Sequence, residues 1–254
     1  INFLKEIKPD YIIHLACTST HPKNSNNPKL VVNDLLMIHN LISTLNHKVK
    51  LINFGSVSEY GKSGILSERA KCTPDTYYGI AKLNSNIVAT MLCKNRRIKL
   101  LTLRVFGVYG PGEDPHRLFP SLIKSILNGK KFFNMSDGEQ IRDFIHVHDV
   151  CTAVREILSL KNFPTGLLNL GTGEGLKVID VCERIVNELS NINRFQLIKN
   201  KSRNLTDKDI LISNNTAIEK ILGHKIPQRL HGNQLYMLFD KDYCKDKILD
   251  TNPL

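Results

Sequence analysis

Short apolar runs alternate with longer amphipathic stretches along most of this chain. The apolar runs predict strands at residues 11–15, 49–54, 100–105 and 167–170. The amphipathic stretches predict helices at residues 29–44, 77–93, 119–127, 148–160 and 178–189. Strands that alternate with helices are typical of a parallel sheet covered by helices on both faces. After about Pro111 the alternation loosens into shorter strands and more loop residues, which indicates a second, smaller lobe.

The size and composition of the chain fit a folded protein and exclude several other classes. Its 254 residues, 41% of them hydrophobic, can bury a full core, which excludes a disordered or fibrous chain. The six cysteines show no CxxC pair and no zinc-ligand spacing, so we expect reduced thiols and no metal site. No apolar run approaches the ~20 residues that span a bilayer, and no signal peptide opens the chain, so we expect a cytoplasmic protein without membrane contact.

The formal charge of +11 raises the question of nucleic-acid binding. The basic residues are spread along the chain, and their densest group, residues 94–99, lies where a solvated turn is expected between a helix and a strand. We therefore expect no nucleic-acid partner. A basic surface also attracts small anions such as diphosphates.

Ligands of open parallel sheets bind beyond the carboxyl ends of the strands, so the residues that follow each strand are candidates for a site. Small residues at positions 16–19 follow the first strand and would let a flat polar ligand approach, although tight packing would equally explain them. The second strand leads into Ser56, whose hydroxyl would then face the ligand crevice. The third leads into the glycine-rich segment 107–112, which leaves room for a ligand.

Tyr78 and Lys82 lie four residues apart in a predicted helix and therefore share one of its faces. A phenol, with an ordinary pKa of about 10, is a poor base at neutral pH, but an adjacent ammonium favours the phenolate. Tyr77 lacks such a partner because Ala81 stands four residues on. A tyrosine and a lysine at this spacing, taken alone, would be equally typical of a solvated helix face without a catalytic role. Together with Ser56 at the end of the preceding strand, it indicates acid–base catalysis.

Arg142 follows a turn and begins a further short strand. Its guanidinium is a natural bidentate donor for a phosphate group. An ordinary surface pair between an arginine and an aspartate would explain the residue equally well, so the sequence around Arg142 leaves both interpretations open.

Taken together, these segments resemble the extended short-chain dehydrogenase/reductases of the NAD-dependent epimerase/dehydratase type. The matching segments follow the family's order along nearly the whole chain and read "IIHLA", "FGSVSEYG", "YGIAK", "LRVFGVYGPG", "DGEQIRDFIHVHDV", "LLNLGTGEG" and "AIEKILGHK". The resemblance implies an α/β fold with a doubly wound, Rossmann-like parallel sheet and a smaller C-terminal substrate-binding lobe. Residues 1–111, with parts of 141–171, would form a partial dinucleotide-binding domain, and residues 112–140 and 172–254 the lobe.

The resemblance also implies roles for individual residues. Tyr78 corresponds to the catalytic acid/base, Lys82 to the residue that lowers its pKa and binds the nicotinamide ribose, and Ser56 to the hydroxyl that orients the substrate. The cofactor, NAD or NADP, would lie along Leu15, Ala16, Cys17, Asn33, Tyr78, Lys82 and Val105. The substrate, a nucleotide sugar, would be held by Ser56, Gly107, Arg142 and Arg203, with the two arginines on its phosphates.

Three departures from the family's pattern limit what the resemblance implies. No G-x-x-G-x-x-G occurs before "PDYIIHLA", so we expect the first βαβ units, each about 30 residues, to be absent and the fold to be N-terminally truncated. Gly107 replaces an asparagine, which removes one polar contact to the substrate phosphate. Val57 and Ser58 replace the Asp–Glu pair of 4,6-dehydratases, so water elimination has no evident acid and base.

Two activities fit the remaining motifs, a 4-epimerase and a 4-keto-sugar reductase. Both move a hydride between sugar C4 and nicotinamide while Tyr78 moves the hydroxyl proton. An alternative of another class is an inactive fragment or a non-catalytic binding member of the family. The family often pairs two long helices per subunit across a dimer interface, here residues 31–44 and 78–93, so we also expect a homodimer.

Overall fold

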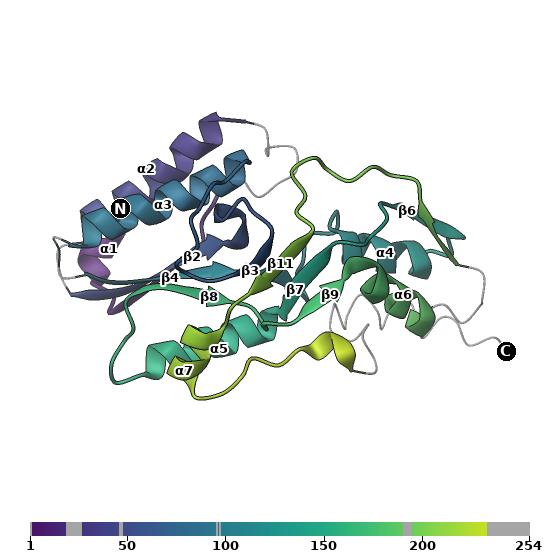
Figure 1. Cartoon of the computed structure of the whole chain (residues 1–254). Coiled ribbons are helices and arrows are strands. Elements are labelled where there is room, and N and C mark those ends of the chain that lie inside the picture. The colour runs from purple at the N-terminus through teal and green to yellow at the C-terminus, as the bar shows by residue number, and fades with distance from the viewer. Residues whose placement is uncertain are drawn as a thin grey trace.

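The computed structural model describes residues 2–18, 27–45, 48–94, 96, 98–189 and 195–232. Two lobes lie side by side (Figure 1). One contains α2 (Lys29–Thr44) and α3 (Tyr77–Lys94), and the other contains α4 (Leu118–Leu127) and α6 (Val178–Leu189). None of the described helices combines the length and apolar character needed to cross a bilayer.

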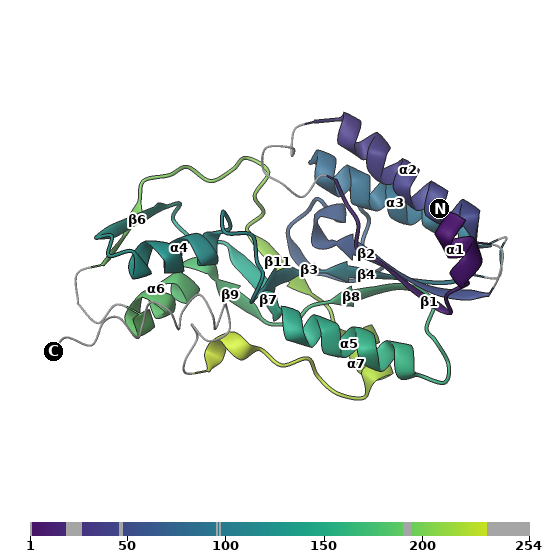
Figure 2. The same ribbon diagram turned by 180° about the vertical axis from the view of Figure 1, so that it is seen from behind.

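The first lobe is built on a four-stranded parallel sheet. Its strands, in spatial order, are β1 (Tyr11–His14), β2 (Val49–Ser56), β4 (Ile98–Val105) and β8 (Gly166–Leu170). Helices α2 and α3 cover one face, and α5 (Val147–Ser159) and α7 (Thr216–Leu222) cover the other (Figures 1 and 2). The short helix α1 (Asn2–Ile7) precedes β1. This arrangement confirms the α/β fold with a parallel sheet, and each predicted strand and helix is present within two residues of its expected ends.

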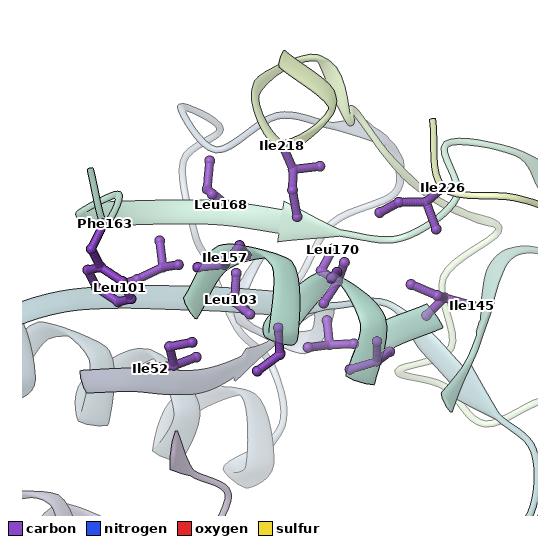
Figure 3. Close-up of a cluster of buried hydrophobic side chains, with 14 residues drawn as sticks. Ile52, Leu101, Leu103, Ile145, Ile157, Phe163, Leu168, Leu170, Ile218 and Ile226 are labelled. Atoms are coloured by element: carbon purple, nitrogen blue, oxygen red, sulfur yellow. The ribbon is translucent and has the colours of Figure 1, made fainter. Parts of the chain in front are cut away.

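Both faces of this sheet are buried, which explains why its strands read as continuous apolar runs. Leu51 and Ile52 are neighbours in β2, point to opposite faces and are both fully buried. One face packs against α5 and α7 through a cluster that includes Leu101, Leu103, Ile157 and Ile218 (Figure 3). The other packs against α2 and α3 through Ile38, Ile42, Ala89 and Cys93. Each fully buried leucine or isoleucine stabilises the fold by about 1.5–3 kcal/mol.

A second sheet lies beside the first and carries the second lobe. Its parallel strands, in spatial order, are β3 (Gly64–Leu66), β11 (Ile210–Ser213), β7 (Ile141–His146) and β5 (Gly107–Tyr109), and β9 (Gly175–Lys177) pairs antiparallel with β7. A separate parallel pair consists of β6 (Phe132–Met135) and β10 (Gln196–Lys199). Because β3 and β5 precede residue 111, the second sheet takes strands from both of the ranges that the sequence assigned to separate domains.

The buried carboxylate of Asp143 in β7 joins three segments that are distant in the sequence. Its oxygens accept hydrogen bonds from the backbone N–H groups of Thr172, Gly173 and Ser213 at 2.7–3.1 Å, and from the Thr172 and Ser213 hydroxyls at 2.7 and 2.5 Å. A Cβ at residue 171 would lie 2.4 Å from the carboxylate, so Gly171 is required there. Asp143 therefore fixes the turn after β8 and the end of β11 against β7, which carries Arg142.

Candidate active site

Ser56 ends β2 and also caps the short 3₁₀ helix Val57–Glu59 that follows. Its Oγ accepts a hydrogen bond from the Ser58 N–H at 3.2 Å, and its own N–H donates to Glu59 Oε1 at 2.9 Å. This reciprocal arrangement is a capping box, which satisfies N–H groups that a helix start leaves free. The Ser56 side chain is thereby fixed at the carboxyl edge of the first sheet.

Tyr78 lies in the first turn of α3, and the Ser56 hydroxyl lies close enough to its phenol to favour the phenolate. Burial raises the pKa of Tyr78 to about 12, and this effect outweighs the lowering by the Ser56 hydroxyl and by the Arg117 guanidinium. The phenol is thus a proton donor at neutral pH. The two hydroxyl groups that the sequence analysis selected thus lie near each other at this edge of the sheet.

Lys82 lies one turn after Tyr78, and its ammonium is 5.9 Å from the centre of the Tyr78 ring. The Lys82 Nζ donates a hydrogen bond to the Phe54 carbonyl at 3.0 Å. The sequence predicted that this ammonium would lower the pKa of Tyr78, but the pKa is raised. The reason is that burial of the phenol dominates, while the ammonium is directed at the carbonyl of β2.

The loop after β1 presents apolar surface at the same edge of the sheet. Leu15 is 62% exposed, and Ala16 beside it is also exposed. The Cys17 thiol donates to Asp34 Oδ2 at 2.8 Å, and the N–H and hydroxyl of Thr18 donate to Asp34 Oδ1, both at 2.7 Å. The carboxylate of Asp34 in α2 therefore holds this loop in place.

Asn33, which the sequence analysis selected in this helix, is exposed, whereas its neighbour Asp34 is only 4% exposed. A signal for Asp34 exists in the sequence. Asp34, Ile38 and Ile42 are spaced four apart, and so Asp34 lies on the face of α2 that packs against the sheet. A carboxylate on an apolar helix face needs hydrogen-bond donors, and the loop after β1 supplies them.

The residues at this edge fit the nicotinamide half of a dinucleotide. A flat ring placed against Leu15 and Ala16 would cover apolar surface that is now exposed, which is favourable. Lys82 retains N–H donors beyond the one used on the Phe54 carbonyl and could hold ribose hydroxyls. Val105, at the end of β4, is 7% exposed and contributes to the floor of this edge.

Two adjoining cavities lie on the side of the second lobe. The first, of about 380 Å³, is lined by residues that follow Ser56 and by charged groups: Val57, Ser58, Asp75, Arg117, Asp207 and Lys208. The second, of about 320 Å³, is lined among others by Phe133, Met135, Lys201, Arg203, Asn204 and Asp207. Asn204 and Asp207 line both cavities, so the two form one groove that begins next to Ser56.

The two arginines predicted to bind phosphate both pair with carboxylates. Arg142 is ion-paired with Asp207, and its guanidinium donates to the carbonyl oxygen of the preceding residue, Ile141, at 2.8 Å. Arg203 pairs with Asp137 and with Asp209, both at 2.8 Å. Arg203 lines the groove directly, and Arg142 borders it through Asp207.

Gly107, at the substrate position where the family has an asparagine, begins β5 and pairs with Phe144 of the neighbouring strand β7. A Cβ built on Gly107 would be 2.9 Å from the Asp143 carbonyl oxygen and 3.1 Å from the Phe144 ring. Any side chain at this position would force β5 and β7 apart. The absence of the asparagine therefore has a packing reason in this chain.

The model of the family described as "NAD dependent epimerase/dehydratase family" matches residues 1–171. The chain belongs to this family. Its sequence is 29% identical over 267 residues to a UDP-glucose 4-epimerase of Mycoplasma pneumoniae, covering 90% of this chain and 75% of that protein. It is 26% identical over 203 residues to a dTDP-D-glucose 4,6-dehydratase of Dictyostelium discoideum, covering 73% of this chain but only 46% of that protein.

Solved structures share the fold over almost the whole chain. MoeE5 in complex with UDP-glucuronic acid and NAD superposes with a TM-score of 0.82 at 23% identity, covering 97% of this chain and 83% of that one. The UDP-glucuronic acid 4-epimerase of Bacillus cereus, in complex with UDP-glucuronic acid and NAD, gives 0.80 at 25% identity, covering 96% of this chain and 77% of that one. The cofactor of this family member is accordingly NAD or NADP.

The raised pKa of Tyr78 predicts a specific dependence of stability on pH. Because the folded pKa of about 12 exceeds the ordinary value of 10.0, the neutral phenol stabilises the fold below pH 10, and this contribution is lost as pH rises towards 12. Between pH 9 and pH 11 the unfolding free energy of the wild type should fall by about 1 kcal/mol more than that of Tyr78→Phe. Urea titrations at both pH values measure this difference, with Tyr77→Phe as the control that behaves like wild type. If the unfolding free energies of wild type and Tyr78→Phe depended equally on pH, the raised pKa of Tyr78 would be contradicted.

Proposed function

We propose that this chain is the catalytic part of an NAD(P)-dependent nucleotide-sugar epimerase or 4-keto-sugar reductase, which transfers hydride at sugar C4 with Tyr78 as the acid/base. The observation that carries the proposal is the proximity of the Ser56 hydroxyl to the Tyr78 phenol, with the Lys82 ammonium 5.9 Å from the centre of the Tyr78 ring, at the carboxyl edge of the first sheet. Membership of the family supports it.

The positions of the two hydroxyl groups support separate roles, with Tyr78 transferring the proton and Ser56 orienting the substrate oxygen. Tyr78 is neutral in its buried environment, so it can give its proton to the C4 oxygen when a ketone is reduced. In the reverse direction its phenolate takes the proton of the C4 hydroxyl. The Ser56 oxygen accepts from the Ser58 N–H, so its proton is directed away from that turn and towards the Tyr78 phenol, where it can orient the same substrate oxygen. Bound NAD(P) supplies or accepts the hydride.

The groove supports a nucleoside diphosphate as the remainder of the substrate. Cationic side chains line it along its length: Arg117, Lys201, Arg203 and Lys208. Phosphate oxygens accept strong hydrogen bonds from such groups. The aromatic ring of Phe133 lies at the far end, where a base could stack. We assign the cofactor groove to Leu15, Ala16, Cys17 and Val105, with Asp34 contacting its loop in place of Asn33.

A 4,6-dehydratase activity is disfavoured by the residues that follow Ser56. Val57 and Ser58 carry no carboxyl group, and the next residue, Glu59, is fully buried. Its carboxylate is ion-paired with Arg104 at 2.8 Å and cannot reach a sugar in the groove.

The test is a turnover assay on the full-length protein with candidate sugar nucleotides. A 4-epimerase would interconvert two nucleotide sugars without net change in NAD(P)H absorbance, whereas a reductase would consume one NAD(P)H for each 4-keto sugar. Binding of cofactor and nucleotide sugar without turnover would instead establish the alternative, a non-catalytic member of the family. If the protein neither bound these ligands nor turned them over, that result would contradict the proposal as a whole.

The proposed role of Arg142 predicts a loss of affinity for the free nucleoside diphosphate. Arg142→Ala should weaken its binding about 10- to 100-fold, since one charge-assisted contact is lost and Asp207 is left without its partner beside the groove. Isothermal titration calorimetry measures the affinity. Arg155→Ala, at an exposed position of α5, is the matched control and should bind like wild type. Unchanged affinity in Arg142→Ala would contradict the phosphate-binding role and leave Arg142 with only its structural ion pair to Asp207.

We also propose a homodimer formed through α2 and α3. Large apolar side chains are about half exposed or more on these helices, at positions spaced four apart: Val32, Leu36, Ile87 and Met91. Exposed large apolar side chains that repeat along a helix are typical of an interface. Leu36→Lys combined with Met91→Lys should yield a monomer in sedimentation experiments. Leu205→Lys, at a fully exposed position of the other lobe, should leave the dimer intact, and a monomeric wild type would overturn this part of the proposal.

A further inference from the structure

We propose that Glu59 is a positioning residue that holds Ser56 in its catalytic orientation, a role that rests on the proposed function. Glu59 is fully buried, and both of its carboxylate oxygens are used. Oε1 accepts from the Ser56 N–H at 2.9 Å, and Oε2 accepts from Arg104 Nε at 2.8 Å. Glu59 itself lies out of reach of the substrate groove and acts only through Ser56.

The partner of Glu59 is itself held rigidly by several strands. Arg104 in β4 is 3% exposed, and its guanidinium lies 4.5 Å from the centre of the Tyr60 ring. The Tyr60 hydroxyl donates to Asn169 Oδ1 in β8 at 2.6 Å, and the Asn169 amide donates to the Leu66 carbonyl in β3 at 2.7 Å. The position of the carboxylate is therefore fixed by elements of both sheets.

The residue before Ser56 leaves room for this carboxylate. A Cβ built on Gly55 would lie 2.3 Å from Glu59 Oε1, so any side chain there would push the carboxylate away from Ser56. Replacing a buried ion pair by apolar groups is often neutral or stabilising, so stability alone does not account for the Glu59–Arg104 pair. Orientation of Ser56 does account for it, because the same carboxylate binds the Ser56 backbone.

The orientation matters because of what the Ser56 hydroxyl contacts. With the Ser56 backbone held by Glu59, its Oγ accepts from the Ser58 N–H at 3.2 Å, and its hydroxyl lies beside the Tyr78 phenol. Loss of the Glu59 contact frees the turn and allows the hydroxyl to rotate. A misplacement of about 1 Å in a catalytic group lowers turnover about 100-fold in typical cases, even when substrate binding is retained.

Two double variants separate positioning from stability. Glu59→Leu with Arg104→Met removes the ion pair and the acceptor for the Ser56 N–H, while Glu59→Gln with Arg104→Met removes the ion pair but keeps a carbonyl oxygen at that place. Both lack an uncompensated buried charge, so both should fold. We expect kcat of the Leu/Met variant to fall at least about tenfold with KM changed less than about twofold, and kcat of the Gln/Met variant to stay within about threefold of wild type.

Amide hydrogen exchange of Ser56 provides a readout that does not depend on activity. The Ser56 N–H should be protected in the wild type and in the Gln/Met variant, and should exchange at least about tenfold faster in the Leu/Met variant. A wild type without turnover would contradict the proposed function, while the exchange rates would still test the positioning. Equal kcat and equal exchange in the two double variants would overturn the inference.

If the double variants fail to fold, Gly55→Ala provides the second test because it leaves both charges in place. Its added methyl group would displace the Glu59 carboxylate from Ser56. Faster exchange of the Ser56 amide together with a lower kcat would support the inference. Wild-type values of both quantities would overturn it.

Discussion

Parallel pairing of β1, β2, β4 and β8 brings the carboxyl ends of all four strands to one edge of the sheet, and the candidate site depends on this constraint. The loop after β1, Ser56 after β2 and Val105 at the end of β4 meet there, although they are separated by long helices in the sequence. Helix α3 adds Tyr78 and Lys82 to the same edge. Each contributing segment is short and carries only one or two of the candidate residues. The candidate site forms only where these segments meet.

A sheet that ends in loops leaves polar backbone groups to be satisfied, and in this chain buried carboxylates satisfy many of them. Asp34 binds the loop after β1, Glu59 binds the turn after β2, and Asp143 binds the turn after β8 together with β11. Each of them is at most 4% exposed. They fix the loops that hold the hydroxyl groups and cations of the groove.

Much of the first lobe could be predicted from the sequence because burial on both faces leaves an unmistakable apolar pattern, as in β2 and β4. Most of the second sheet could not be predicted from the sequence. Its strands β3, β5 and β9 have three residues each, and their pairing partners are distant in the sequence. Local periodicity carries no information about such pairs.

The site shows the same division. The position of Ser56 at a strand end and the shared helix face of Tyr78 and Lys82 followed from periodicity and spacing, which are local features. The pKa of Tyr78 did not, because burial by the surrounding chain raises it whereas the sequence showed only the lysine. Asp34 was missed for a similar reason: the sequence named only Asn33 in this helix, and tertiary packing is what shows the Asp34 carboxylate holding the loop after β1.

The central claim is that Tyr78 transfers the proton of the reaction, and the most direct measurement compares kcat of Tyr78→Phe with that of Tyr77→Phe in the full-length protein. The two variants remove the same hydroxyl group from adjacent positions of α3, one buried beside the Ser56 hydroxyl and the other 40% exposed. The account predicts that Tyr78→Phe loses at least about 100-fold in kcat with nucleotide-sugar binding retained, while Tyr77→Phe stays within a few-fold of wild type. Turnover by Tyr78→Phe within a few-fold of wild type would contradict it.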